Sequence, residues 1–296
     1  MPHKAIYNLI NTCNIDDYNV RKIKLHSTAA LVMLWVKAYY KEYPAVKFIK
    51  HLDLSEGQRL LDLCNTICDW YGEIIANRKY FIYHTMSEKL KTANSPWQIV
   101  ILAAGMCPLS LNLLAKNDKK IKKIFEIDEF GMEEKENIYQ NFFPEYARKI
   151  KCIPTSIYEK RLMDLLTDAG YRKELQTIIF AEGISYYIRK RRLKEVFQSF
   201  ATGRNIVVLE YLVPRNNISN ENRKISDEIF NIIKKECELA RISRYTQSEL
   251  KRIFIQYGGA FLRHETMSGM EFLRTGSNQF FNRQNEGWIE CIIGRL

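Results

Sequence analysis

Three short strings in the sequence combine buried-type apolar residues with small residues and carboxylates. Gln98–Gly105 is a run of β-branched residues that ends in two alanines and a glycine. Lys123–Asp128 ends on two carboxylates, and Thr177–Ile188 runs from apolar residues into an acid and a glycine. In an α/β sheet, a glycine turn lets backbone N–H groups approach a ligand, and an acid at the tip of the next strand accepts hydrogen bonds from ribose hydroxyls. The strings therefore predict a site for a nucleotide-type ligand.

Apolar runs alternate with amphipathic stretches along the second two thirds of the chain. Strands are expected at 98–103, 123–127, 150–154, 176–181, 205–212, 259–266 and 287–294. Helices are expected near 107–118, 131–141, 157–170, 189–201, 221–241 and 246–257. This alternation predicts an α/β fold, in which a mostly parallel sheet carries helices on both faces. No strong helix pattern separates the last two strands, so they are expected to form an antiparallel hairpin at the sheet edge.

The N-terminal third has the apolar spacing of helices rather than strands. Val20–Tyr43 and Leu52–Leu90 both show this spacing. The Ser95-Pro96 pair is the clearest boundary before the first strand. We therefore expect two parts: residues 1–95 as a helical cap that contributes to the substrate pocket, and residues 96–296 as the sheet domain.

Composition narrows the class of protein. No run of about 18 uncharged apolar residues is present, so no membrane-spanning helix is expected, and the first residues lack the apolar core of a signal peptide. The seven cysteines are scattered and odd in number, which predicts free thiols and a cytoplasmic setting. Cys64 and Cys68 have no second pair at zinc spacing, so no metal site is expected.

The formal net charge is +11, with basic clusters at Lys119–Lys123 and Arg189–Lys194. Either cluster could meet phosphate backbones. However, no recognition helix, zinc finger or aromatic RNA-binding motif accompanies them. The sequence therefore favours solvated helix surfaces over a nucleic-acid partner, while acidic substrates or an anionic carrier surface stay open as explanations.

The strings resemble those of class I S-adenosylmethionine-dependent methyltransferases. Within that class they are similar to the leucine carboxyl methyltransferase family, which also contains polyketide O-methyltransferases. Ala103–Cys107 stands at the family's G-x-G-x-D turn, Glu126–Asp128 at its E-x-D string, and Glu182–Ile188 matches its E-G-x-x-x-Y-[LI] string. Arg78 stands where the family carries an arginine before the sheet. The resemblance spans residues 77–212 and implies a seven-stranded Rossmann-like sheet with an N-terminal helical cap and S-adenosylmethionine as cofactor.

Four features depart from the family pattern, and one of them is that Arg78–Tyr83 lacks the aspartate that usually follows the arginine. Ala103 replaces the first glycine of the turn, Cys107 replaces its acid, and Ser156 stands where an aspartate often follows the third strand. Alanine can replace glycine where φ stays negative. A serine can still form one hydrogen bond with an adenine amino group, although more weakly than a carboxylate. We expect a divergent but active site, with a non-catalytic scaffold as the alternative.

The resemblance implies cofactor contacts from eight residues: Arg78, Ala103, Gly105, Glu126, Asp128, Ser156, Glu182 and Tyr187. Arg78 would pair with the cofactor's carboxylate, and Gly105 would admit its amino-acid part. Asp128, or Glu126 two positions away on the same strand, would accept hydrogen bonds from the ribose. Glu182 would lie near the ammonium. Tyr187 is as well explained by the core as by the site.

Methyl transfer is an in-line displacement, for which a protein aligns the nucleophile and excludes water. A carboxylate acceptor needs no base, whereas a hydroxyl would be helped by one. The candidate bases are His84 and Tyr186, with His264 as a weaker one. The predicted function is O-methylation of a small, natural-product-like metabolite, with S-adenosylhomocysteine as product. A protein C-terminal carboxyl methyltransferase is the alternative within the class, and an NAD-dependent oxidoreductase is disfavoured because a full G-x-G-x-x-G motif is missing.

Overall fold

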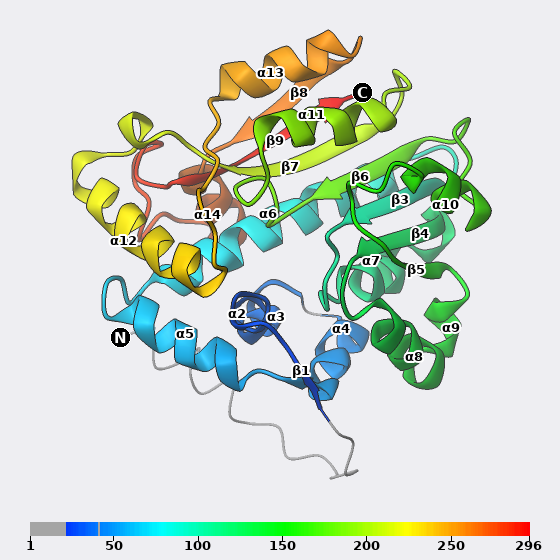
Figure 1. The fold of residues 1–296 in the computed structure, drawn as a ribbon, viewed down its shortest axis with the longest axis horizontal. Helices are drawn as coiled ribbons and strands as arrows, with labels where there is room; N and C mark the ends of the chain where they lie inside the picture. Colours follow the sequence, from blue (N-terminus) through cyan, green and yellow to red (C-terminus); the bar gives the residue numbers. More distant parts are fainter. Residues whose placement is uncertain (1–21, 41) are drawn as a thin grey trace.

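A seven-stranded sheet forms the centre of the molecule, in the order β5-β4-β3-β6-β7-β9-β8 (Figure 1). The computed structural model describes residues 22–40 and 42–296. The strands are β3 (Trp97–Leu102), β4 (Ile121–Asp128), β5 (Ile150–Pro154), β6 (Thr177–Ala181), β7 (Ile206–Leu212), β8 (Ala260–Glu265) and β9 (Ile289–Arg295). The first five are parallel, and β9 lies antiparallel between β7 and β8. The predicted α/β fold with an antiparallel terminal pair is confirmed.

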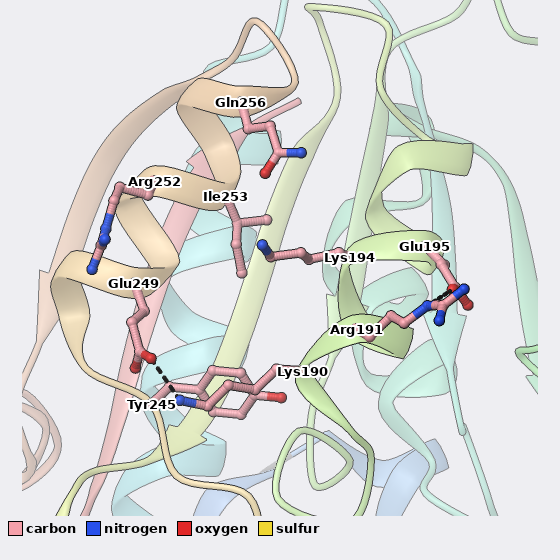
Figure 2. Close-up of a pocket in the computed structure, with 9 residues that line it drawn as sticks. All are labelled: Lys190, Arg191, Lys194, Glu195, Tyr245, Glu249, Arg252, Ile253 and Gln256. Carbon is pink, nitrogen blue, oxygen red and sulfur yellow. Dashed lines mark hydrogen bonds and ion pairs between the residues drawn. The ribbon is translucent and has the colours of Figure 1, made fainter.

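Helices cover both faces of this sheet (Figure 1). They are α7 (Leu109–Asn117), α8 (Met132–Phe142), α9 (Pro144–Ala147), α10 (Leu162–Asp168), α11 (Lys190–Ser199), α12 (Asn220–Glu236), α13 (Gln247–Gln256) and α14 (Met267–Thr275). Short 3-10 turns lie at Asp118–Lys120 and Arg215–Asn217. The helices α11 and α13 leave a hollow between them (Figure 2). No helix of the described ranges is both long and apolar enough to cross a bilayer.

The N-terminal region is helical, as predicted, but is divided more finely than expected. It contains α2 (Ser27–Leu34), α3 (Val36–Tyr39), α4 (Tyr43–Phe48), α5 (Ser55–Asn65) and α6 (Tyr71–Lys91), with a 3-10 turn at Ile49–His51. Two short strands that were not expected, β1 (Ile23–Lys24) and β2 (Leu52–Asp53), pair in parallel. The first residues of the expected helix from Val20, and also Cys13, lie outside the described residues.

Helix α6 runs beneath the sheet across the middle of the molecule (Figure 1) and is buried on most of its sides. Its first turn contains Gly72, where a Cβ atom would come within 1.9 Å of the Trp35 ring. Only glycine therefore permits this close approach between α6 and the segment that joins α2 to α3. The position of α6 decides where the two cations Arg78 and Lys79 lie.

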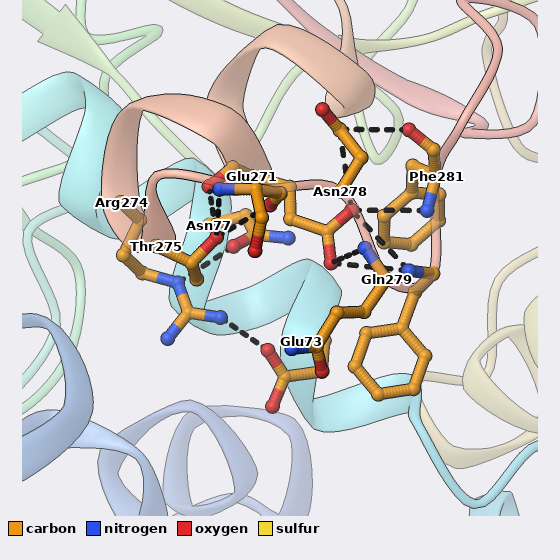
Figure 3. Close-up of polar contacts among 10 residues, drawn as sticks. Glu73, Asn77, Glu271, Arg274, Thr275, Asn278, Gln279 and Phe281 are labelled. Carbon is orange, nitrogen blue, oxygen red and sulfur yellow. Dashed lines mark hydrogen bonds and ion pairs between the residues drawn. The ribbon is translucent and has the colours of Figure 1, made fainter.

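Helix α14, which lies between β8 and β9, was not expected from the sequence. Its side chains form polar contacts with the first turns of α6 (Figure 3). Arg274 of α14 donates to Oδ1 of Asn77 at 2.6 Å and forms an ion pair with Glu73. Glu271 is 1% exposed and accepts hydrogen bonds from the backbone N–H groups of Gln279, Phe280 and Phe281. The helix is short and contains a glycine, so these tertiary contacts explain why its local pattern was weak.

The six cysteines in the described part of the chain are free. Burial raises the pKa of Cys64 and of Cys68 to about 12, which leaves both as neutral thiols at physiological pH. Within residues 22–40 and 42–296, no three His, Cys, Asp or Glu side chains gather closely enough to hold a metal ion.

Candidate cofactor site

A cavity of about 180 Å³ lies where β3 and β6 end. Its walls come from the turn 101–107 after β3, from Arg78 and Lys79 of α6, from the segment 182–187 after β6, and from α2, which supplies Val32 and Met33. Sites for small ligands usually have volumes of about 300–1,000 Å³. The cavity is therefore smaller than a usual site for a whole ligand of this kind.

The turn after β3 has two residues in the left-handed region of backbone space. These are Ala103 (φ +51°) and Gly105 (φ +46°). A Cβ atom added to Gly105 would meet no atom within 4 Å, so this part of the backbone borders open space. The negative φ under which an alanine easily replaces a glycine is therefore not present at Ala103. The turn imposes on this alanine a conformation that costs an L-residue about 1–2 kcal/mol.

Replacing Ala103 with glycine is expected to raise the free energy of unfolding by about 0.5–1 kcal/mol. Relief of the left-handed strain exceeds the entropy that glycine adds to the unfolded chain. Urea denaturation of the two proteins measures the change. Ala104→Gly is the matched control, because φ is not positive there, and it should destabilise the protein. An Ala103→Gly variant less stable than the wild type would contradict the strain.

The turn is held from below by Lys135, a residue of α8 that is completely buried. Its ammonium donates to the carbonyl oxygens of Gly105 (2.7 Å) and Cys107 (2.9 Å), and forms an ion pair with Glu126 at 2.8 Å. Glu126 also accepts hydrogen bonds from Ser110 and Tyr139. The structure thus places Glu126 beneath the turn and away from the cavity, which corrects its interpretation as an alternate ribose acceptor. Nothing in the sequence singles out Lys135 among the other lysines.

Asp128 ends β4 beside the same turn. Its carboxylate accepts hydrogen bonds from the backbone N–H groups of Gly105 (2.9 Å) and Phe130 (3.1 Å). The Phe130 side chain is 79% exposed. This aromatic ring was missed in the sequence, although an exposed phenylalanine directly after a strand-end acid is a usable signal. Asp128 therefore lies at the open side of the turn.

Two cations and two carboxylates meet in the wall of the cavity. Arg78 is 5% exposed and forms ion pairs with Glu210 of β7 and, at 3.5 Å, with Glu182. The Lys79 ammonium lies 2.8 Å from Glu182 and 3.1 Å from the Cys107 sulfur. The Nε of Arg78 is buried without a hydrogen-bond partner. The cavity wall therefore contains an unused donor.

Glu210 was missed by sequence reasoning, although a signal for it existed. It stands alone among apolar residues in β7, a strand that is buried throughout. A buried acid requires a partner, so a lone glutamate in such a strand indicates a cation from another element. Burial raises the pKa of the Glu210 carboxyl, while Arg78 acts in the opposite direction.

Lys79 remains a cation despite its burial. Burial by itself lowers its pKa, but Cys107 and Glu182 raise it, and the net shift is upward. Cys107 occupies the position of the acid in the family's turn, and it lies against this ammonium. The Lys79 ammonium therefore lies between Glu182 and the sulfur of the turn.

Tyr186 and Tyr187 both line the cavity. The Tyr186 hydroxyl donates to Glu210 at 3.1 Å. Burial, and then the Glu210 carboxylate, raise the pKa of Tyr186 well above its ordinary value. The phenol therefore stays protonated at neutral pH. It can donate a hydrogen bond, but the structure does not support its interpretation as a general base.

The structure does not bring His84, Ser156 or His264 to the cavity. His84 stacks on Tyr80 with ring centroids 5.4 Å apart, and six residues of helix rotate it about 240° from Arg78. The Ser156 hydroxyl accepts from the Tyr158 backbone N–H. His264 lies on β8 at the far edge of the sheet. The prediction that His84 faces the pocket as a base is therefore wrong. Ser156 lies outside the cavity, on the open side of the turn, where β5 ends.

Comparisons with known proteins add independent findings. The family model for leucine carboxyl methyltransferases matches residues 68–201. A candidate methyltransferase from Thermobifida fusca superposes with a TM-score of 0.60 at 11% identity, covering 94% of this chain and 96% of that one. A DUF574 family protein from Streptomyces avermitilis superposes with a TM-score of 0.62 at 8% identity, covering 90% and 96%. No curated protein matches the sequence.

The structural likenesses, at these identities, show a shared fold. The family match shows a similarity in sequence as well as in fold. Its range contains α6, the turn after β3, the E-I-D string and the E-G-I-S-Y-Y-I string. The resemblance inferred from those strings is confirmed. Residues 68–201 are therefore similar to the leucine carboxyl methyltransferase family, whose model they match, and the similarity covers the segments after β3 and β6 that line the cavity.

Proposed function

We propose that the protein transfers a methyl group from S-adenosylmethionine to an oxygen atom of a small acceptor. The observation that carries the proposal is the cavity at the ends of β3 and β6, which is lined both by an open glycine turn and by Arg78, whose buried Nε has no hydrogen-bond partner. The bound cofactor would supply a methyl group on a positively charged sulfur. The helical cap of residues 1–95 and the sheet domain of residues 96–296 remain part of the proposal.

The residues present suit this cofactor on two observations: Gly105 leaves space beside its backbone, and the Arg78 Nε is a buried donor without an acceptor. Arg78 would hold the carboxylate through Nε, since its Nη1 is taken by Glu210 and Glu182. Glu182 would lie near the ammonium. Asp128 would accept from the ribose hydroxyls.

The adenine would lie on the open side of the turn. Phe130 offers an exposed ring there, next to Asp128. Ser156 follows the end of β5, the strand that pairs with β4. These two residues would contact the base, the first by packing and the second by a single hydrogen bond.

A carboxylate is favoured over a hydroxyl as the acceptor. Tyr186 stays protonated, Lys79 stays charged and Glu182 is paired with both neighbouring cations, so none of these three lining residues is free to act as a base. An ionised carboxylate needs none. Val32 and Met33 of α2 would keep water out. The small volume of the cavity, about 180 Å³, favours a small metabolite over the terminus of a protein chain, with cytoplasmic secondary metabolism as the proposed setting.

Calorimetric titration with S-adenosylhomocysteine tests the proposal. One site with micromolar affinity is the expected result, followed by methylation of small carboxylic acids in preference to phenols. No binding at millimolar ligand would reject a methyltransferase and favour a scaffold whose turn has lost the cofactor. Protection against thermal unfolding by NAD, but not by S-adenosylhomocysteine, would instead indicate an oxidoreductase.

A further inference from the structure

Two adjoining hollows form one trough on the surface of the sheet domain. The first, about 630 Å³, lies between α11 and α13 (Figure 2). The second, about 520 Å³, lies between the start of α11 and residues 241–244. Lys190 and Arg191 line both hollows. We call this surface the basic trough, because seven cationic but only two acidic side chains line it.

Both acidic side chains of the basic trough already form ion pairs with cations of the trough. Glu249 pairs with Lys190 at 2.6 Å, and Glu195 pairs with Arg191 at 2.9 Å. Four lining cations form no ion pair within the described residues: Arg189, Lys194, Arg241 and Arg252. Like charges gathered in a hollow repel one another, so the arrangement opposes folding unless a counter-charge binds.

The N-terminus of α11 adds positive potential to the same place. Its N-cap residue is Arg189, which forms no side-chain cap, and its first turn contains no acid. The first three helical residues are Lys190, Arg191 and Arg192. Cations at this end of a helix oppose the macrodipole, whereas an anion there is stabilised by it and by the free N–H groups.

The shape and lining of the trough indicate the kind of anion. Tyr245 is fully buried and lies under the Lys190 ammonium, 5.3 Å from the ring centroid, so it offers no face on which a base could stack. This disfavours single-stranded nucleic acid, which usually needs such faces. A hollow of this volume is in the range of small-ligand sites. Guanidinium groups match phosphate oxygens in a bidentate geometry.

The trough lies next to the segment that closes one end of the cofactor cavity. Arg189 follows the cavity residue Tyr187 by two positions, so their Cα atoms lie within about 7.6 Å. Ser243, on the floor of the trough, donates its N–H to the Tyr186 carbonyl (2.9 Å) and its hydroxyl to the Ile188 carbonyl (2.6 Å). A ligand anchored in the trough would thus be held next to the reaction site.

We infer that the basic trough binds a small molecule with two or more phosphate charges, and that this molecule is the methyl acceptor. The binding of phosphate stands on the trough alone. The identity of the ligand as acceptor rests on the proposed methyl transfer, because only that reaction gives the neighbouring cavity a use for it.

Calorimetric titration with inorganic tripolyphosphate, alongside S-adenosylhomocysteine, tests the inference on the whole chain. The trough variant is Arg189→Glu with Arg252→Glu, both exposed and without ion pairs in the described structure. The matched control is Lys119→Glu with Lys122→Glu, exposed residues of the other basic cluster with the same change in net charge. The wild type and the control should bind tripolyphosphate, while the trough variant should bind it at least tenfold more weakly. All three should bind S-adenosylhomocysteine equally.

Equal loss of tripolyphosphate binding in both variants, or no binding by the wild type, would overturn the inference even if S-adenosylhomocysteine binds. Loss in the trough variant alone, with no S-adenosylhomocysteine binding by any protein, would keep the phosphate site and reject the proposed function. A single-stranded RNA that binds through the trough and is not displaced by tripolyphosphate would also overturn it. For the acceptor role, a phosphorylated carboxylic acid should be methylated at least tenfold faster than its unphosphorylated counterpart, and equal rates would reject that role.

Discussion

Replacing Lys135 with methionine is expected to lower the free energy of unfolding by about 3–5 kcal/mol, the range seen when one partner of a buried ion pair is removed. The Lys135 ammonium and the Glu126 carboxylate are both fully buried, and their atoms lie 2.8 Å apart. Methionine would leave the Glu126 charge unpaired, and it would also leave the carbonyl oxygens of Gly105 and Cys107 without their donor. Chemical denaturation measures the effect.

A second variant separates the charge from the packing. Lys135→Met combined with Glu126→Gln removes both charges, and it should recover more than half of the lost stability, because a neutral amide is far cheaper to bury than a carboxylate. Lys122→Met, at an exposed position of the same strand as Glu126, is the control and should change stability by at most about 0.5 kcal/mol. A loss below about 1 kcal/mol for Lys135→Met would contradict the role assigned to this ion pair.

Replacing Asp128 with asparagine is expected to weaken S-adenosylhomocysteine binding about 10- to 100-fold, which corresponds to the loss of a hydrogen bond to a charged acceptor. The carboxylate accepts from the Gly105 and Phe130 backbone N–H groups, and in the proposed site it would accept from the ribose as well. An asparagine offers one acceptor oxygen in place of two. The variant therefore loses both a ribose contact and part of the support for the turn.

Glu129→Gln is the matched control for the Asp128 variant. Glu129 is the next residue along the chain and is exposed, and its replacement removes the same charge. Calorimetric titration should show unchanged affinity for this control. If Asp128→Asn also binds with wild-type affinity while its stability falls, Asp128 serves only to hold the turn, and the ribose contact must come from elsewhere.

The strands of the sheet could be located from the sequence because burial on both faces leaves a continuous apolar run. β3, β6 and β7 are such runs, and the structure places them within one residue of the expected starts. The terminal antiparallel pair followed from the lack of a strong helix pattern between the last two strands. Helix α14 lies in that stretch, and it depends on contacts with α6 that no local pattern encodes.

Some residues of the candidate site could likewise be found from the sequence, whereas the placement of others depended on the tertiary structure. Gly105 and Asp128 could be found in the sequence because a turn and a strand end have local signatures, and the structure joins them by a hydrogen bond of 2.9 Å. Glu126 shares a string with Asp128, yet it pairs with Lys135 beneath the turn. Which of two acids faces a ligand depends on the helix packed against the strand, and that packing is a long-range property.

The sequence by itself determined the α/β class, the order of strands along the chain, the resemblance to the leucine carboxyl methyltransferase family, and the turn and the acids among which the proposed cofactor contacts lie. These features depend on residues close together in the chain, where periodicity and short motifs are visible. Only the tertiary structure decided that Arg78 meets Glu210, that Ala103 has a positive φ, and that cations at 189–194, 241–244 and 252 form one trough. Those features arise where segments distant in the chain are packed together, because the charge and conformation of each side chain then depend on partners that its own segment does not contain.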